Sequence, residues 1–395
     1  MTVSPWQRPL DAIEADIAIV GAGITGAATA FWLSQIEPDA RVVLVEAERV
    51  AHGASGRNAG FLLLGTHRDY ASAVETYGPE AARRIWTFTT ETLDLIERYV
   101  DPEAVGLSWS GSLIAAGSGD EAARLRRSRD LLGAEGIETE WVSPDDLPGR
   151  SGVSGMEGAL FVPRGGAVDP ARLVQWLVHA SGVEVREGWP VASVEVGDRS
   201  VRLGVEGGGE VRAGRVLVAT NAWAGRLVPA LAEIVRPVRA QMLATAPVGP
   251  LLHAPVYSHD GYFYIRQQPD GRILLGGGRH LHRESEVGLA DATTDAVQAD
   301  LQAYLARHVP EAGEASIERR WSGAMGFSPD GLPVLGEVPG MEGVQYAVGF
   351  TGHGMGYGMR FGLLAARHLL GRAGPALDLF HSDRLKRPEA GPRLN

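Results

Sequence analysis

The chain has 395 residues, more than a typical single core accommodates, so two domains are expected. Its formal net charge of −11 argues against nucleic acid as the main partner, and its lack of cysteine excludes disulfides and thiolate metal sites. No apolar run reaches the ~18 residues of a membrane span and the N-terminus lacks the apolar core of a secretory signal, so we expect a cytoplasmic protein.

The first predicted elements are a strand, a glycine-rich loop and a helix. Residues 16–20 are an apolar run typical of a buried strand, and residues 27–36 fit a helix. Between them Gly21 permits a tight turn, Gly23 lets the backbone approach a pyrophosphate, and Gly26 lets the helix pack on the strand. The free amides at the helix start attract phosphates. In this context the Gly-x-Gly-x-x-Gly pattern predicts a dinucleotide site.

The next predicted strand, over residues 42–45, ends at Glu46, 20 residues after Gly26. A carboxylate at this place can accept hydrogen bonds from a ribose hydroxyl. The pattern does not by itself choose between NAD and FAD as the dinucleotide.

The later elements follow from the spacing of apolar residues and from turn signals. Helices are expected within residues 71–99, 120–134, 169–178, 291–308 and 355–370. Strands are expected at residues 183–185, 191–196, 201–205, 211, 215–218 and 344–349. Residues 262–266 and 272–275 flank a Pro-Asp-Gly turn signal and predict an antiparallel hairpin. A sheet begun at the N-terminus and completed at the C-terminus would enclose the intervening material as a second domain.

Five motifs occur in a fixed order along the chain. They are residues 21–26 with Glu46, residues 53–60, residues 219–223, residues 328–336 and residues 349–355. In these motifs the sequence resembles the FAD-dependent amine and amino-acid oxidoreductases, a family that includes sarcosine oxidase, glycine oxidase, D-amino-acid dehydrogenase and γ-glutamylputrescine oxidase. The resemblance covers essentially the whole chain and implies FAD as the cofactor in place of NAD.

The family's cofactor contacts carry over by position. Residues 55–60 are expected to follow the pyrophosphate and the flavin edge, the backbone of Val191 to meet the adenine, and residues 352–355 to face the flavin pyrimidine. The FAD is expected to be non-covalent, since there is no cysteine and no histidine near Asn58. The implied cofactor residues are Gly21, Ala22, Gly23, Ile24, Thr25, Gly26, Glu46, Ala47, Ser55, Gly56, Arg57, Asn58, Ala59, Gly60, Val191, Thr220, Asn221, Trp223, Gly352, His353, Gly354 and Met355.

The resemblance implies an α/β fold with a Rossmann-like FAD-binding domain and a second, mixed β-sheet substrate domain. The FAD-binding domain is expected to be discontinuous, built from residues 1–75, 150–240 and 320–395. The substrate domain is expected to take residues 76–149 and 241–319.

Two departures from the family pattern concern charge. Many relatives carry arginine in a Trp-x-Gly-x-Arg-Pro pattern, and here Met325 takes that place, so a common carboxylate anchor is missing. Sarcosine-oxidase-like members carry lysines near the flavin, whereas the only lysine in this chain is Lys386. We therefore expect an acceptor such as a quinone or dye to be favoured over oxygen.

The predicted hairpin supplies the candidate substrate groups. In a strand, Tyr262, Tyr264 and Arg266 would share one face, where the aromatic rings could hold an amine and the guanidinium a carboxylate. Alternatively, this face is simply the wet side of an amphipathic strand. His353 is a candidate catalytic residue with Tyr264 and Arg266, or a helix-capping histidine with no catalytic part, and Met325 is expected to contact substrate. Weaker candidates in nearby loops, expected to be solvated, are His67, His259, Arg279 and His280.

The expected reaction is hydride transfer from an amine-bearing carbon of a small amine or amino acid to the flavin, followed by hydrolysis of the imine. Two alternatives remain open: oxidation of a 2-hydroxy acid or other alcohol on the same scaffold, and a non-catalytic FAD-binding protein. The negative net charge of the chain argues against a tRNA substrate. No spacing of histidine and acidic residues predicts a metal site.

Overall fold

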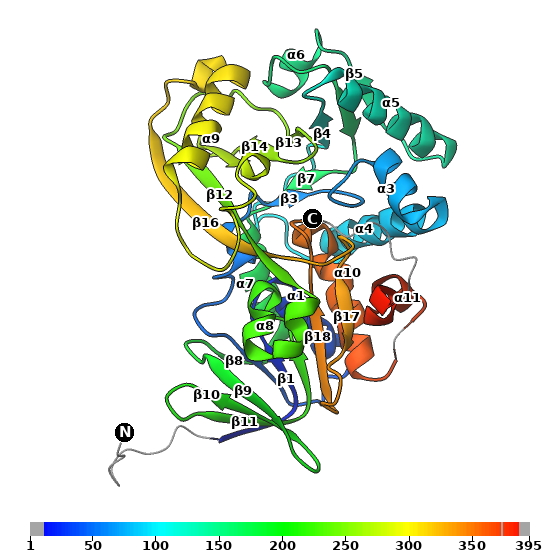
Figure 1. The fold of residues 1–395 in the computed structure, drawn as a ribbon, viewed down its shortest axis with the longest axis vertical. Coiled ribbons are helices and arrows are strands. Elements are labelled where there is room, and N and C mark those ends of the chain that lie inside the picture. Colours follow the sequence, from blue (N-terminus) through cyan, green and yellow to red (C-terminus); the bar gives the residue numbers. More distant parts are fainter. Residues whose placement is uncertain (1–11, 373, 387–395) are drawn as a thin grey trace.

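Two large β-sheets organise the fold in the computed structural model, which describes residues 12–372 and 374–386. The first sheet lies in the lower half of Figure 1 and the second in the upper half. A third, two-stranded sheet pairs β3 (Phe61–Leu62) with β7 (Gly166–Ala167). The prediction of a mixed α/β fold is confirmed. Within the described residues, no helix is both long and apolar enough to cross a membrane.

The first sheet has the parallel core that the apolar runs predict. Its path is β17 (Val334–Glu337), β18 (Val344–Val348), β11 (Glu210–Val218), β1 (Ala12–Val20), β2 (Val42–Val45) and β8 (Glu184–Arg186), and β10 (Val201–Val205) and β9 (Val191–Val196) extend it from β11. The pairs of β1 with β2 and with β11 are parallel. All four residues of β2 are buried, because helices and loops cover both faces of the sheet.

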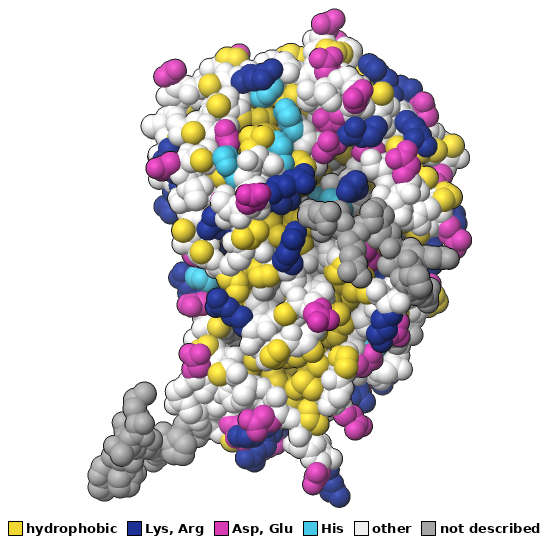
Figure 2. Space-filling model, viewed as in Figure 1, with side chains coloured by type: hydrophobic (Ala, Val, Ile, Leu, Met, Phe, Trp, Pro, Cys, Tyr) yellow, Lys and Arg dark blue, Asp and Glu magenta, His cyan; other side chains and the backbone are white. Residues whose placement is uncertain are grey.

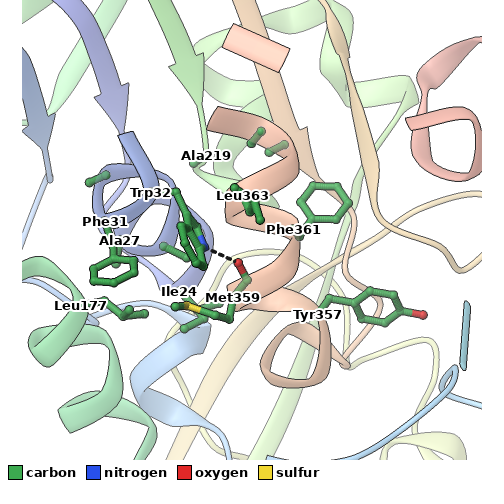
Figure 3. Packing of buried hydrophobic residues seen from close by; sticks show 14 of the residues in the cluster. Ile24, Ala27, Phe31, Trp32, Leu177, Ala219, Tyr357, Met359, Phe361 and Leu363 are labelled. Carbon is green, nitrogen blue, oxygen red and sulfur yellow. Dashed lines mark hydrogen bonds between the residues drawn. The ribbon is translucent and has the colours of Figure 1, made fainter. Parts of the chain in front are cut away.

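Helices α1 (Ile24–Ile36) and α10 (Gly354–Leu369) pack closely against each other beside this sheet, as Figure 3 shows. The contact is close because α10 presents glycines: a Cβ on Gly362 would lie 2.4 Å from the Cβ of Ala28. The indole Nε1 of Trp32 donates a 2.9 Å hydrogen bond to the carbonyl of Met359. The first turns of both helices therefore lie beside the same end of the sheet.

This packing predicts opposite effects for two glycine-to-alanine changes in helices. Gly362→Ala would press a methyl group into α1 and is expected to destabilise the fold by about 1–3 kcal/mol. Gly133→Ala, on α5 (Gly119–Ala134), meets nothing within 4 Å and is expected to add about 0.5–1 kcal/mol through helix propensity. Urea unfolding measures the change in the free energy of unfolding for both variants. An unchanged free energy in Gly362→Ala would show that α1 and α10 can move apart without cost.

The second sheet is mixed and forms the upper body of the molecule. Its order is β16 (Ile317–Phe327), β12 (Arg236–Thr245), β15 (Ile273–Gly277), β14 (Phe263–Gln267), β13 (Val256–Ser258), β4 (Ser112–Ala115), β6 (Ala159–Val162) and β5 (Glu140–Val142). The remaining α-helices are α2 (Ala54–Arg57), α3 (Tyr70–Tyr77), α4 (Pro79–Tyr99), α6 (Leu147–Ser151), α7 (Pro170–Ser181), α8 (Ala224–Leu227), α9 (Asp295–His308) and α11 (Leu377–Phe380).

The elements depart from the sequence-based expectations in one place. The helix expected within residues 71–99 is split by Gly78, whose φ of 83° ends α3 before Pro79 starts α4. The expected domain boundaries stay a prediction, and two contacts cross them. Strand β16 pairs with β12 in the second sheet although it runs past residue 320, and α4 packs on α10, with Arg360 bound to Glu91 at 2.8 Å.

Candidate active site

A cavity of about 1160 Å³ lies between the two sheets. The loops that follow β1, β2 and β11 and the start of α10 form one part of its wall, and residues of β13, β14 and the turn after β15 form another. Cavities for drug-sized ligands are roughly 300–1,000 Å³. This one is therefore large enough for an extended cofactor and a small substrate together.

The first part of the cavity is a cradle for a dinucleotide. A Cβ on Gly26 would lie 1.9 Å from the carbonyl oxygen of Gly21, so only glycine lets α1 approach the end of β1 so closely. The amide of Ile24, at the helix start, donates to Oγ of Ser55 at 2.9 Å. Amides at the start of a helix are the donors that bind phosphate oxygens. Glu46 closes the cradle by accepting from the amides of Ala22 and Glu48 at 2.8 and 3.0 Å.

Most of the sequence-predicted cofactor residues line this cavity. Those in its wall are Gly21, Gly23, Ile24, Thr25, Glu46, Ala47, Ser55, Asn58, Ala59, Val191, Thr220, Asn221, Trp223, Gly352, His353, Gly354 and Met355. Those that lie behind the wall are Ala22, Gly26, Gly56, Arg57 and Gly60. Gly56 and Gly60 lie close to the backbone of other segments. A Cβ on Gly56 would lie 2.2 Å from the carbonyl oxygen of Ala51, and a Cβ on Gly60 would lie 2.0 Å from that of Val168.

Arg57 does not line the cavity. Its guanidinium donates to the carbonyls of His52 and Ser322, both at 2.9 Å, and forms a 2.7 Å ion pair with Asp291. It therefore ties α2 to β16, and its charge is balanced by a carboxylate outside the cavity wall.

Several polar atoms in the wall have no protein partner. Oγ1 of Thr220 and Nδ1 of His67 and His353 are buried without a hydrogen bond among the described residues. Buried polar atoms are normally satisfied, so these three fit a site whose ligand supplies the partners. The residues of the cradle and of the wall thus suit a phosphate-bearing cofactor with a polar ring system.

The two histidines share an apolar setting at the start of α10. His353 is the residue before that helix and is 8% exposed, and its ring lies 6.5 Å from the ring of His67. Burial lowers the pKa of His353 to about 4. Burial, with His353 and Arg68 nearby, lowers the pKa of His67 to about 3. Both imidazoles are neutral at pH 7.

The part of the cavity nearest β14 is aromatic. The rings of Phe61, Tyr257 and Tyr264 have centroids 6.0–6.4 Å apart, and the ring of Tyr257 lies 5.7 Å from that of His353. Tyr262 and Met325 also line the cavity. Sequence reasoning missed Tyr257, because β13 has only three residues and its pairing with β14 gives no local signal.

Arg279 lines the cavity, whereas Arg266, the arginine that the sequence indicated, does not. Arg266 does not line the cavity; it is 8% exposed, its Nε has no hydrogen-bond partner, and burial lowers its pKa to about 10. Arg279, expected to be solvated, lines the cavity with its guanidinium 5.3 Å from the ring centre of Tyr262 and 5.0 Å from that of Phe327. Among the described residues no carboxylate is within ion-pair distance of Arg279.

The register of the hairpin explains where Arg279 lies. Phe263 pairs with Gly277, so the residues after β15 come back beside Tyr262. Arg283, in the same loop, donates a 3.0 Å hydrogen bond to the hydroxyl of Tyr262. In the view of Figure 2, histidine side chains gather over this upper part of the molecule, close to arginine or lysine side chains. The hairpin signal in the sequence could have indicated Arg279 once its register was followed.

The cradle and the cavity define a dinucleotide-dependent enzyme site. The profile of the family described as FAD dependent oxidoreductase, DAO, matches residues 16–368. The chain belongs to this family of oxidoreductases, and FAD is its cofactor. The prediction of the family and the prediction of FAD as the cofactor are thereby confirmed.

Individual relatives agree with this assignment over nearly the full length. The chain is 30% identical to glycine oxidase of Geobacillus kaustophilus over 92% of this chain and 95% of the relative. It is 26% identical to γ-glutamylputrescine oxidoreductase of Escherichia coli over 94% of this chain and 87% of the relative. The crystal structure of the Geobacillus glycine oxidase superposes with a TM-score of 0.78 at 25% identity, covering 92% of this chain and 96% of that one.

Glu46 is expected to contribute to FAD affinity through hydrogen bonds to the ribose. Glu46→Ala should weaken FAD binding by about 1–3 kcal/mol, the usual cost of losing bonds to a charged group. Glu48→Ala is the matched control, because Glu48 also lines the cavity but its side chain is exposed. Quenching of FAD fluorescence on titration with apoprotein measures both affinities. Equal affinities for the two variants would contradict this role of Glu46.

The FAD is expected to be bound non-covalently and therefore to dissociate from the chain when the protein unfolds. The whole sequence has no cysteine, so no bond between the flavin and a cysteine sulfur can form. Heat denaturation followed by ultrafiltration should carry all yellow colour into the filtrate. Colour retained by the precipitated chain would show a covalent bond.

Proposed function

We propose that the protein oxidises the carbon–nitrogen bond of a small amine or amino acid and that water hydrolyses the resulting imine. FAD supplies the hydride acceptor for this reaction. The observation that carries the proposal is that one cavity joins the dinucleotide cradle to an aromatic region with an arginine that has no carboxylate partner. Relatives named for glycine and for γ-glutamylputrescine support an amine as the substrate class.

The cavity favours the neutral form of a bound amine. Desolvation holds the pKa of His67 and His353 far below the ordinary histidine value of 6.5. The same desolvation acts on any cationic group placed there, so it lowers the pKa of a substrate ammonium as well. A neutral amine carries the lone pair that the reaction needs, and no side-chain base is then required to generate it.

Aromatic rings and Arg279 bind different parts of the substrate in this proposal. Phe61, Tyr257 and Tyr264 offer apolar faces to the carbon skeleton of the substrate, and Tyr264 keeps its proton because burial raises its pKa to about 12. We place the carboxylate of an amino-acid substrate on Arg279, whose planar guanidinium can bind it bidentately. Arg266 is the alternative anchor, and Met325 adds no second charge in this region.

Oxidation of a 2-hydroxy acid is supported less well by the cavity. Removing a hydroxyl proton calls for a base whose pKa lies near the working pH. Two of the histidines that line the cavity, His67 and His353, have pKa values of about 3 and about 4, so both are weak bases.

Anaerobic mixing of the holoenzyme with a substrate panel tests the proposal. The panel contains primary and secondary amines, amino acids of both chiralities and 2-hydroxy acids, and the readout is loss of oxidised flavin absorbance. We expect bleaching by an amine or amino acid, with ammonia or a primary amine released on reaction with an acceptor. Bleaching by hydroxy acids alone would favour the alcohol reaction. Flavin that stays oxidised with every compound would favour a non-catalytic FAD-binding protein.

A further inference from the structure

Three potential metal ligands lie together at the edge of the first sheet. Glu337 ends the edge strand β17, His368 lies in the last turn of α10, and His381 follows α11. One ligand atom from each residue lies within 4.8 Å of the other two. None of the three lines the cavity, so this cluster is separate from the FAD site.

The fold holds the three residues in place through their backbones. His381 forms a parallel β-bridge with Leu335, two residues before Glu337, so the C-terminal segment lies along the edge of β17. Three residues further on, Arg384 makes a 2.7 Å ion pair with Asp330, in which both side chains are at most 12% exposed. The ligand atoms therefore come from two regular elements and one firmly attached segment.

His368 carries a buried nitrogen whose one polar neighbour among the described residues is the carboxylate of Glu337. The residue is 9% exposed, and its Nε2 lies 2.9 Å from Oε1 of Glu337. That contact lacks hydrogen-bond geometry, and Nε2 has no partner elsewhere among the described residues. Nε2 of His381 lies 3.4 Å from Oε2 of the same carboxylate. Two ligands about 2.0–2.1 Å from a tetrahedral ion are roughly 3.3 Å apart, so a cation fits between these atoms after small shifts.

We propose that Glu337, His368 and His381 bind a divalent transition-metal ion that fastens the C-terminal segment to α10 and β17. Two imidazoles and one carboxylate are a donor set that suits Zn²⁺, with water in the fourth position. Asp383 lies behind the ring of His381: its backbone amide donates to Nδ1 at 3.3 Å, and its Oδ2 lies 3.2 Å from the same nitrogen. When Nε2 binds the ion, the ring takes the tautomer in which Nδ1–H faces Oδ2, the arrangement of carboxylates behind metal-bound histidines. The site is structural, since it is apart from the cavity.

Calorimetric titration of the FAD-loaded, tag-free protein with zinc chloride tests the site. We expect saturable binding of one ion per chain in the wild type and its loss in His368→Ala and His381→Ala. Asp383→Asn should weaken the affinity about 10–100-fold. His179→Ala is the matched control, because His179 is an exposed histidine on α7 and lies outside the cluster.

Thermal unfolding followed by flavin release gives a second readout. Zinc should raise the melting temperature of the wild type and of His179→Ala, and leave that of Glu337→Gln unchanged, while the flavin absorbance shows that each variant is folded. Three outcomes would overturn the proposal: no saturable binding by the wild type, several weak ions per chain, or equal binding by the His368→Ala and His381→Ala variants.

Discussion

Arg279→Leu is expected to lower kcat/KM for amino-acid substrates by about 30-fold or more, mainly by raising KM. Removing the partner of a desolvated carboxylate costs about 2 kcal/mol or more, and each 1.4 kcal/mol corresponds to about tenfold. Simple amines, which lack the carboxylate, should keep their kinetics within a few-fold. Steady-state assays with matched pairs, each an amino acid and its decarboxylated amine, measure the difference.

Two arginines provide controls for this variant. Arg266→Leu removes the guanidinium that lies behind the cavity wall and should leave the amino-acid preference intact. Arg283→Leu removes an exposed guanidinium beside the same tyrosine, Tyr262, and should change mainly the salt dependence of KM. If Arg266→Leu selectively lost amino-acid turnover while Arg279→Leu was unaffected, Arg266 would be the residue that binds the substrate carboxylate.

The reduced enzyme is expected to pass its electrons to a quinone or dye much faster than to oxygen. Negative charge develops when oxygen accepts electrons, and a well-placed positive group that stabilises such charge is worth about 10²–10³-fold in rate. The chain has one lysine, Lys386, which ion-pairs with Asp383 outside the cavity. Arg57 is paired with Asp291, and the low pKa of His353 keeps its ring neutral. Arg279 is the cation that we place on the substrate carboxylate, beside Tyr262 and Phe327.

Stopped-flow reoxidation with air, and then with a quinone analogue, measures this preference. Because the pKa of His353 lies near 4, its ring gains no charge as the pH falls through the ordinary histidine value of 6.5, and the oxygen rate should show no rise there. Reoxidation in air that keeps pace with reduction by substrate would contradict the prediction and make the enzyme an oxidase.

The cofactor half of the protein could be predicted because its signals are contiguous in the chain. In residues 16–46 the strand, the glycine loop, the helix and the acid follow one another, and each imposes its own backbone requirement. Gly26, for example, is needed for one close approach that any Cβ would prevent. Closing the sheet with β18 and α10 was also predictable, since the second glycine loop repeats the same strand–loop–helix order.

The substrate half could be predicted only in part, because it depends on pairing between distant segments. Period-2 alternation predicts which residues share a face of β14 but not which end of the strand reaches the cavity. It therefore indicates Arg266, and not Arg279, as the carboxylate-binding arginine. The aromatic wall needs β13 beside β14, and His67 beside His353. The Glu337 cluster has no local spacing at all, since its ligands meet only when three segments pack together.

The order of pairing in the first sheet has a consequence for how the protein is made. Strand β1 needs β11 on one side, and Ile17 is in register with Arg215, almost 200 residues later. Ribosomes add about 5–20 residues per second, so β1 and β2 emerge on the order of ten seconds or more before that partner exists. Contacts this distant in sequence also slow folding itself. The cavity wall also includes residues 350–356, so the complete FAD site exists only late in synthesis.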